Sequence, residues 1–224
     1  LEFRRVLFRS IRIAPLASSA NGTGSAGNDH PIGPTNAYFN SELPQRTYDP
    51  DKAKFHLKKA GMENLTVKLS TSEGIWEGAV DAATLYSESA AKAGINLEVN
   101  KVPNDGYWSN IWLKHPWSAS YWSGRATEDW MFTSAYAAGG SWNETRWAHP
   151  RFNELLKAAR GELDQNKARD MYWEMQQITR DEGGAVIPLF GDWLDAHTDK
   201  LTHGELKGNR ELDGLRALRR WWFV

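Results

Sequence analysis

The segment Ser118–Phe132, S-A-S-Y-W-S-G-R-A-T-E-D-W-M-F, carries the densest set of side chains that could do chemistry. Tyr121 and Trp122 stand at the end of an extended run, and Arg125 follows a glycine. A rigid aromatic ring offers apolar contact area, and a guanidinium group grips a carboxylate or phosphate. The pattern therefore predicts a small-ligand site. The alternative, a core tryptophan beside a surface arginine, is equally compatible with the sequence.

Glu128 and Asp129 lie between Trp122 and Trp130, which raises the alternative of a tryptophan-rich carbohydrate hydrolase. Adjacent residues of a helix point about 100° apart, so the two carboxylates would not face each other across a bond. Acidic side chains in a first helical turn are explained by the helix dipole. We therefore expect no catalytic residue and no enzyme. The hydrolase would show turnover that is lost in Glu128→Gln.

Metal and cofactor chemistry has little support in the sequence. The chain has no cysteine, and its six histidines form neither H-x-x-x-H nor H-E-x-x-H. It contains neither a G-x-S-x-G elbow nor a Walker loop. Its 27 basic residues balance 28 acidic ones, which argues against nucleic acid as a partner. We expect no metal site and no cofactor.

Composition indicates a globular protein with an unusual excess of tryptophan. The 224 residues are 41% hydrophobic and 25% charged. Eleven of the twelve tryptophans lie at or after Trp108, so they form either a core or a ligand surface. The basic start of the chain lacks the apolar stretch of a secretory signal, because Arg9, Ser10 and Arg12 interrupt it.

The elements that must position the candidate site begin with a β-α-β unit. Asp49 and Pro50 cap a predicted helix that ends at Gly61. Alternating strands are predicted at 65–70 and 95–102, with a helix at 76–93 between them. Such strands are parallel, and ligands of parallel sheets bind beyond the carboxyl ends of the strands. That rule points to 71–76 and 103–108, and makes Trp76 a candidate.

The rest of the chain predicts mostly helices. The expected helices are 104–114, 128–138, one opened by Pro150, and 164–182; 117–122 is expected to be extended, and 185–190 and 193–197 are expected to be strands.

From Tyr48 onward the chain resembles a large family of transport proteins. The matching stretches are Y-D-P-D-K-A-K-F-H-L-K-K-A-G at Tyr48, S-A-A-K-A-G-I-N-L-E-V at Ser89, N-D-G-Y-W at Asn104, Y-W-S-G-R-A-T-E-D-W at Tyr121, H-P-R-F-N-E-L-L at His149 and A-R-D-M-Y-W-E-M-Q at Ala168. A further stretch, G-N-D-H-P-I-G-P at Gly27, resembles the linker before this region. Their order and spacing resemble the C-terminal part of the family 5 extracellular solute-binding proteins of peptide, nickel and opine ABC importers.

The resemblance implies an α/β fold of the type II, Venus-flytrap kind with a mixed sheet, of which this chain is a truncated second lobe. We expect residues 1–27 to be a foreign or disordered segment, 28–48 a linker, 49–182 the C-terminal lobe, and 183–224 a segment that returns to a missing first lobe. On that basis Val186–Phe190 and Trp193–His197 would lack strand partners.

The resemblance also sharpens the site. Family members often carry Gly-Trp-x-x-Asp where this chain has Tyr121 to Arg125, and in peptide binders that aspartate holds the ligand ammonium. The reversed charge of Arg125 would attract a carboxylate or phosphate instead, so we expect an anionic or N-blocked solute, such as an opine-like one. The predicted ligand-binding residues are Trp122, Arg125, Tyr121, Trp76 and Trp130.

The resemblance implies the solute-binding component of an ABC importer. It would be periplasmic and monomeric at full length, capturing a peptide-like or opine-like small solute for the permease's transmembrane subunits. A non-functional truncation product is the second alternative; it would show no cooperative melting transition.

Overall fold

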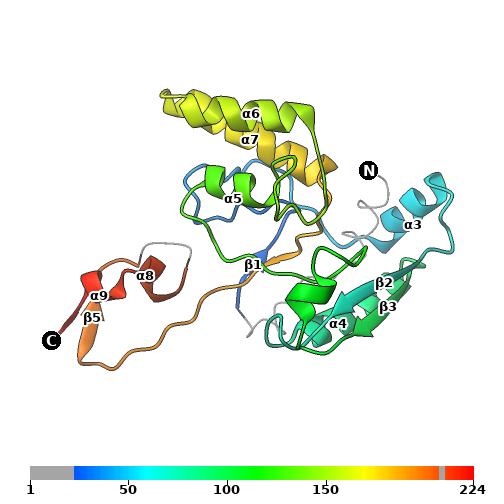
Figure 1. The fold of residues 1–224 in the computed structure, drawn as a ribbon, viewed down its shortest axis with the longest axis horizontal. Helices are drawn as coiled ribbons and strands as arrows, with labels where there is room; N and C mark the ends of the chain where they lie inside the picture. Colours follow the sequence, from blue (N-terminus) through cyan, green and yellow to red (C-terminus); the bar gives the residue numbers. More distant parts are fainter. Residues whose placement is uncertain (1–22, 207–209) are drawn as a thin grey trace.

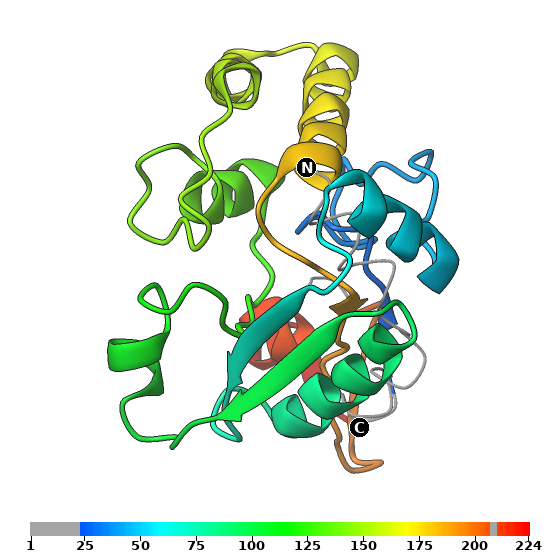
Figure 2. The same cartoon turned by 90° about the vertical axis from the view of Figure 1, so that its right-hand side faces the viewer.

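The computed structural model describes residues 23–206 and 210–224. Two bodies are visible in both ribbon views (Figures 1 and 2): a β-α-β body with strands β2 and β3, and a helical body with helices α5 to α7. The chain passes between them in the linker and again after α7. A C-terminal segment extends away from both in Figure 1.

The β-α-β body confirms the predicted unit. Helix α3 (Pro50–Lys59) starts at Asp49, whose side chain accepts a hydrogen bond from the amide of Lys52 at 2.9 Å. Strands β2 (Thr66–Thr71) and β3 (Asn96–Lys101) are parallel, with helix α4 (Ala79–Ala91) between them in sequence. The core of this body is made of small and aliphatic side chains together with one tyrosine: Ala53, Leu57, Leu69, Ala83, Tyr86, Ala90, Ala93, Ile95 and Leu97.

The predicted extended run at 117–122 continues this sheet for a short distance. The amide of Ser70 donates to the carbonyl of Trp117 at 3.1 Å, and the amide of Ala119 donates to the carbonyl of Ser70 at 2.8 Å. These bonds form a parallel bridge between Ser70 and Ser118. The residues just beyond it, including Tyr121 and Trp122, are thereby tied to the β2 side of the sheet.

The helix expected at 104–114 is much shorter in the structure. A single turn of π-helix, η1 (Tyr107–Ile111), begins after Gly106, which has a φ of 75°. A Cβ on Gly106 would lie 2.6 Å from Asn110 Nδ2, so the turn is closed tightly around glycine. The backbone leaves the helical conformation at Trp112, which has a ψ of 137°, and Leu113 follows with a φ of 61°.

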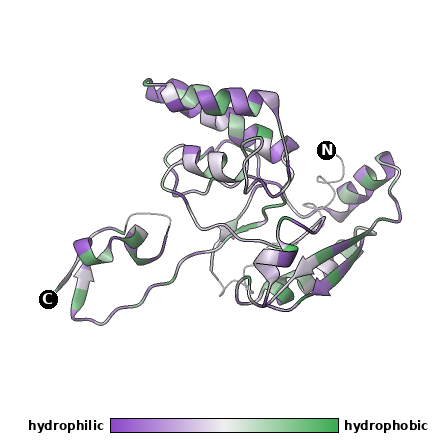
Figure 3. Ribbon diagram, in the orientation of Figure 1, coloured by the Kyte–Doolittle hydropathy of each residue, from purple (hydrophilic) through white to green (hydrophobic). Residues whose placement is uncertain are grey.

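The helical body contains α5 (Glu128–Ala135), α6 (Pro150–Gly161) and α7 (Gln165–Glu182). Side chains of Thr127, His149 and Asp164 cap their amino ends. Figure 3 shows apolar and polar residues alternating along α6 and α7, as expected of helices with one buried face. The buried residues of this body are Ile32, Met131, Phe132, Ala135, Tyr136, Phe152, Leu155, Leu156, Ala159, Tyr172 and Met175.

Two chain segments cross between the bodies and pair with each other. Strand β1 (Ser25–Ala26) is antiparallel to β4 (Leu189–Phe190). The amide of Gly27 adds a bond to the carbonyl of Pro188 at 2.8 Å. The expectation that Val186–Phe190 lacks a strand partner is therefore wrong. The described part of the expected foreign or disordered segment, residues 23–27, supplies that partner; residues 1–22 lie outside the described residues.

A buried ion-pair network holds this crossing in place. Asp29, which is fully buried, accepts from the amide of Ile187 at 2.9 Å and pairs with Arg46 at 3.2 Å. Arg46 also pairs with Asp181 at the end of α7, at 2.9 Å. One network thus joins the linker, the last turn of α7 and the returning chain.

The C-terminal segment forms its own small unit. Strands β5 (Leu201–His203) and β6 (Trp221–Phe223) are antiparallel, with the short turns α8 (Glu211–Leu215) and α9 (Ala217–Arg220) between them. Residues 212–214 within α8 have left-handed backbone angles. The strand expected at Trp193–His197 is absent, because the backbone there makes no ladder bonds. The return of residues 183–224 to another lobe stays a prediction.

No helix in the described part of the chain is long and apolar enough to span a membrane.

Candidate functional site

A cavity of about 1640 Å³ lies where the two bodies and the returning chain meet. The loop after β2 and the run 113–124 supply much of one wall, while residues 144–146 and parts of α5 supply another. Residues 184–195, several linker residues between Pro31 and Asn36, one side of α4 and a few side chains of the C-terminal segment also line it. The cavity thus occurs near the carboxyl end of β2, as the rule for parallel sheets predicts.

Three of the five predicted site residues line this cavity: Trp76, Tyr121 and Trp122. Arg125 and Trp130 are not among its lining residues. Instead, the Arg125 guanidinium lies over the Trp122 ring at 5.3 Å and over the Trp130 ring at 5.4 Å. Arg125 therefore does not line the cavity itself but contacts Trp122, which does. Trp130, which is half-exposed, is a neighbour of Arg125.

The Arg125 guanidinium is also fixed by its own loop, since it donates to the carbonyl of Ser123 at 2.8 Å. Burial, and secondly the positive charge of Arg210, lower the pKa of Arg125 from its ordinary value. Arg210 lines the cavity. Two positive side chains thus influence each other at this side of the site.

The loop that carries Trp76 is held by an amide that the sequence reasoning missed. Asn104, just after β3, accepts from Ser72 Oγ at 2.7 Å and from the amide of Gly74 at 2.8 Å. The loops after the two parallel strands are thereby joined at the same sheet edge. Trp76 packs against the small cluster that contains Tyr107. The N-D-G turn after the second strand was the available signal for Asn104.

His115, which lines the cavity, is a second residue that the sequence reasoning missed. Its Nδ1 lies 2.9 Å from Ser70 Oγ, and Asn100 Nδ2 donates to that same oxygen at 3.0 Å. Ser70 Oγ thus joins the ring of His115 to the side chain of Asn100. In the sequence His115 is a lone histidine outside any metal-binding motif, so nothing indicated that it would line a cavity.

Glu144 is the third missed residue, and it stands in the loop after α5. Its Oε1 accepts from Trp112 Nε1 and from Ser120 Oγ, each at 2.5 Å. Both Ser120 and Glu144 line the cavity. Trp108 contacts Trp112 and Tyr121 edge to face, at centroid distances of 5.7 and 5.8 Å. Trp112, which donates to the carboxylate, thus belongs to a cluster of three aromatic rings.

The two carboxylates of the hydrolase alternative are placed elsewhere. Glu128 is buried and accepts from the amide of Tyr38 at 2.7 Å. Asp129 pairs with Arg160 at 3.1 Å. Neither lines the large cavity. Both side chains hold the helical body together, as first-turn acidic residues of α5. Within the described residues, no three His, Asp or Glu side chains could jointly hold a metal ion.

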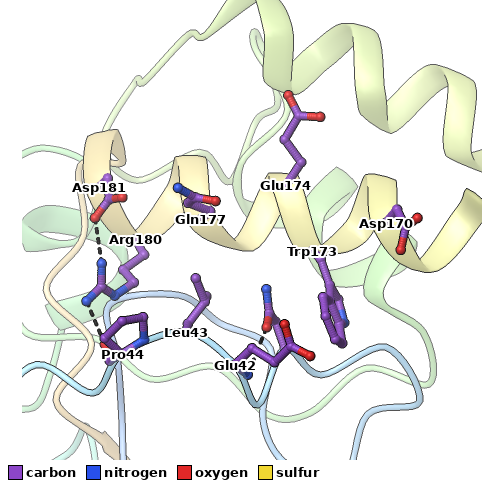
Figure 4. Close-up of a pocket in the computed structure, with 10 residues that line it drawn as sticks. Glu42, Leu43, Pro44, Asp170, Trp173, Glu174, Gln177, Arg180 and Asp181 are labelled. Carbon is purple, nitrogen blue, oxygen red and sulfur yellow. Dashed lines mark hydrogen bonds and ion pairs between the residues drawn. The ribbon is translucent and has the colours of Figure 1, made fainter.

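A smaller cavity of about 600 Å³ runs between α7 and the loop 40–44 (Figure 4). Trp173, Gln177 and Arg180 face it from the helix. Arg180 is engaged on both sides, with Asp181 at 2.8 Å and the carbonyl of Pro44 at 2.6 Å. The charged groups of this smaller cavity hold the loop to α7, and none of the predicted site residues lines it. We therefore take the larger cavity as the candidate site.

Comparisons with known proteins agree on one family. Residues 14–144 match the family model "Bacterial extracellular solute-binding proteins, family 5 Middle". Di/tripeptide-binding protein 4 of Pseudomonas aeruginosa is 30% identical over 172 residues, which cover 71% of this chain and 31% of that protein. The dipeptide-binding protein of Escherichia coli is 26% identical over 173 residues, 70% of this chain and 31% of that protein. The chain spans about a third of the length of these curated relatives.

Solved structures show the same fold. The periplasmic binding protein DppA of Helicobacter pylori, in complex with the peptide STSA, has a TM-score of 0.80 and 21% identity, covering 95% of this chain and 42% of that one. MoaA of A. tumefaciens R10, in complex with mannopinic acid, has a TM-score of 0.72 and 23% identity, covering 92% and 43%.

Proposed function

Because the chain belongs to the family 5 bacterial extracellular solute-binding proteins, we propose that it binds a peptide-like or opine-like solute for an ABC importer. Its fold is that of the type II periplasmic binding proteins. On this proposal the protein acts in the periplasm, captures the solute without converting it, and hands it to the permease in the membrane.

The observation that carries the proposal is the 1640 Å³ cavity with Trp76, Tyr121 and Trp122 in its wall. Rigid aromatic side chains supply contact area at a low cost in conformational entropy. A site of this size accommodates a short peptide or a sugar–amino acid conjugate. Relatives that bind such solutes include those described as di/tripeptide-binding protein 4 and MoaA with mannopinic acid.

Arg125 supports a solute that carries a carboxylate. Arg125 and Arg210 are like charges, and an anion beside them relieves their mutual repulsion. The Trp122 ring lies between Arg125 and the cavity, so the effect of Arg125 is mainly on the local potential. We therefore propose Trp122 as a contact residue and Arg125 as the group that fixes its ring and adds positive charge.

Titration calorimetry with the peptide Ser-Thr-Ser-Ala and with mannopinic acid tests this assignment. We expect Trp122→Ala to weaken binding of the accepted probe by about 30-fold, the usual loss when a buried aromatic anchor is truncated. Trp173→Ala is the matched control, because Trp173 lies on α7 beside the smaller cavity and does not line the large one. Unchanged affinity in Trp122→Ala would remove Trp122 from the site.

A further inference from the structure

The loop that carries Glu144 is built rigidly from within. Asn143, which is buried, donates from Nδ2 to the carbonyls of Ala137 at 3.1 Å and Trp147 at 2.7 Å. Its Oδ1 accepts from the amide of Trp147 at 3.2 Å. The loop is therefore closed around one side chain, and the neighbouring residue Glu144 is held at a fixed place in the cavity wall.

The Glu144 carboxylate is oriented but not neutralised. Trp112 Nε1 and Ser120 Oγ both donate to Oε1, so two neutral donors fix the orientation of the group. None of the ion pairs within the described residues includes Glu144. A carboxylate accepts about four hydrogen bonds, and those found here use one oxygen. Oε2 is therefore the acceptor that remains for a solute.

The charge of Glu144 acts on its surroundings. The pKa of Tyr107 is raised to about 12, first by burial and to a smaller extent by the negative charge of Glu144. The rings of Tyr121 and Trp122 line the same cavity, close to Ser120 in the chain. A negative charge and aromatic rings in the lining of one cavity are an arrangement that attracts organic cations.

We propose that Glu144 binds a primary ammonium group of the solute, with Oε2 as the acceptor and the neighbouring rings as its apolar wall. An ammonium group is a donor without acceptors, which complements a carboxylate oxygen. The proposal rests on the proposed function in taking this cavity as the solute site. It replaces the N-blocked solute expected from Arg125 with one that carries both a carboxylate and a free amine.

The first test needs no knowledge of the natural solute. The indole N–H resonance of Trp112, identified by its loss in Trp112→Phe, is followed while n-butylammonium chloride is added to the full chain. We expect a saturable shift in the wild type, no shift with sodium n-butyrate, and at least a tenfold weaker response in Glu144→Gln. Gln keeps the shape and the acceptor oxygen, so the loop stays folded. A shift that persists in Glu144→Gln, or the absence of any shift, overturns the assignment.

The second test separates the assignment from the proposed function. Calorimetry compares Ser-Thr-Ser-Ala with its N-acetyl form on the wild type, Glu144→Gln and Glu77→Gln, a matched change of another cavity-lining carboxylate. We expect the free amine to bind about tenfold more tightly, and expect this preference to vanish in Glu144→Gln alone. An unchanged preference in Glu144→Gln overturns the role of Glu144 and leaves the proposed function standing. No binding of either peptide, with a Glu144-dependent butylammonium shift, overturns the peptide-like solute and retains the cation site.

Discussion

Trp122 and Arg125 combine features of both interpretations of the sequence, a ligand site and a core tryptophan beside an arginine. Trp122 lines the cavity and also packs against the helical body, while Arg125 lies over two indole rings. The residue types of the segment favour a ligand site, but they do not indicate which side chain faces the cavity. That distinction depends on the loop 122–127, which makes no regular ladder and so carries no period in the sequence.

Asp29 is the residue whose loss we expect to cost most stability. Asp29 and Arg46 are almost completely buried, and loss of the Asp29 charge leaves the buried guanidinium of Arg46 paired with Asp181, which is partly exposed. We expect Asp29→Asn to lower the free energy of unfolding by about 3 kcal/mol, measured by urea denaturation. Glu174→Gln is the control, because its pair with Arg151 is exposed to solvent and should contribute little to stability. A loss below about 1 kcal/mol in Asp29→Asn would contradict the role given to the network.

The β-α-β unit and the three long helices could be predicted because their signals are local. Asp49 and Pro50 set the start of α3, and the period of Phe152, Leu155, Leu156 and Ala159 set the buried face of α6. The pairing of β1 with β4 could not be predicted in the same way. Two strands of two residues each, far apart in the chain, carry no periodic pattern.

A substitution at Gly27 tests the pairing of β1 with β4. A Cβ at Gly27 would lie 2.2 Å from the carbonyl oxygen of Ile187, so Gly27→Ala must separate the two chain segments. We expect it to lower the melting temperature, by the equivalent of about 1–3 kcal/mol. At Gly161 the φ is not positive and a Cβ meets nothing within 4 Å. Gly161→Ala should therefore change stability by less than about 0.5 kcal/mol. Equal effects of the two changes would count against the close approach.

Tyr107 links η1 to the end of the sheet, and its raised pKa predicts that the stability of the fold falls at alkaline pH. Its hydroxyl donates to the carbonyls of Ala119 at 2.6 Å and Ser70 at 3.2 Å. Burial is the main cause that raises the pKa of Tyr107 from 10.0 to about 12. The folded state thus retains the proton more strongly than the unfolded state.

Stability from Tyr107 is therefore fully present below pH 10 and is lost as the pH rises from about 10 to 12. Urea denaturation at a series of pH values should show this decline, and Tyr107→Phe should make it shallower, while it also loses the two hydrogen bonds at neutral pH. Tyr172, whose pKa is also raised to about 12, still contributes in that variant. An identical pH profile for wild type and Tyr107→Phe would contradict the account.

At the scale of the whole molecule, the cavity belongs to no single element. It is lined by the loop after β2, the loop after α5, the linker and the returning chain after α7. The Asp29–Arg46 network joins the last two to the end of α7. The motifs identified the family, and the large cavity is where three of the five predicted residues meet. The oppositely charged groups, Glu144 and Arg210, come from distant segments, so neither was predictable from spacing.

The central claim is that this cavity captures a solute without transforming it. The most direct measurement is calorimetric titration of the chain with Ser-Thr-Ser-Ala and with mannopinic acid, followed by mass spectrometry of the recovered compound. The account predicts saturable one-to-one binding of at least one of the two, with the compound recovered unchanged. Conversion of either compound to a product, or no saturable binding of both, would contradict it.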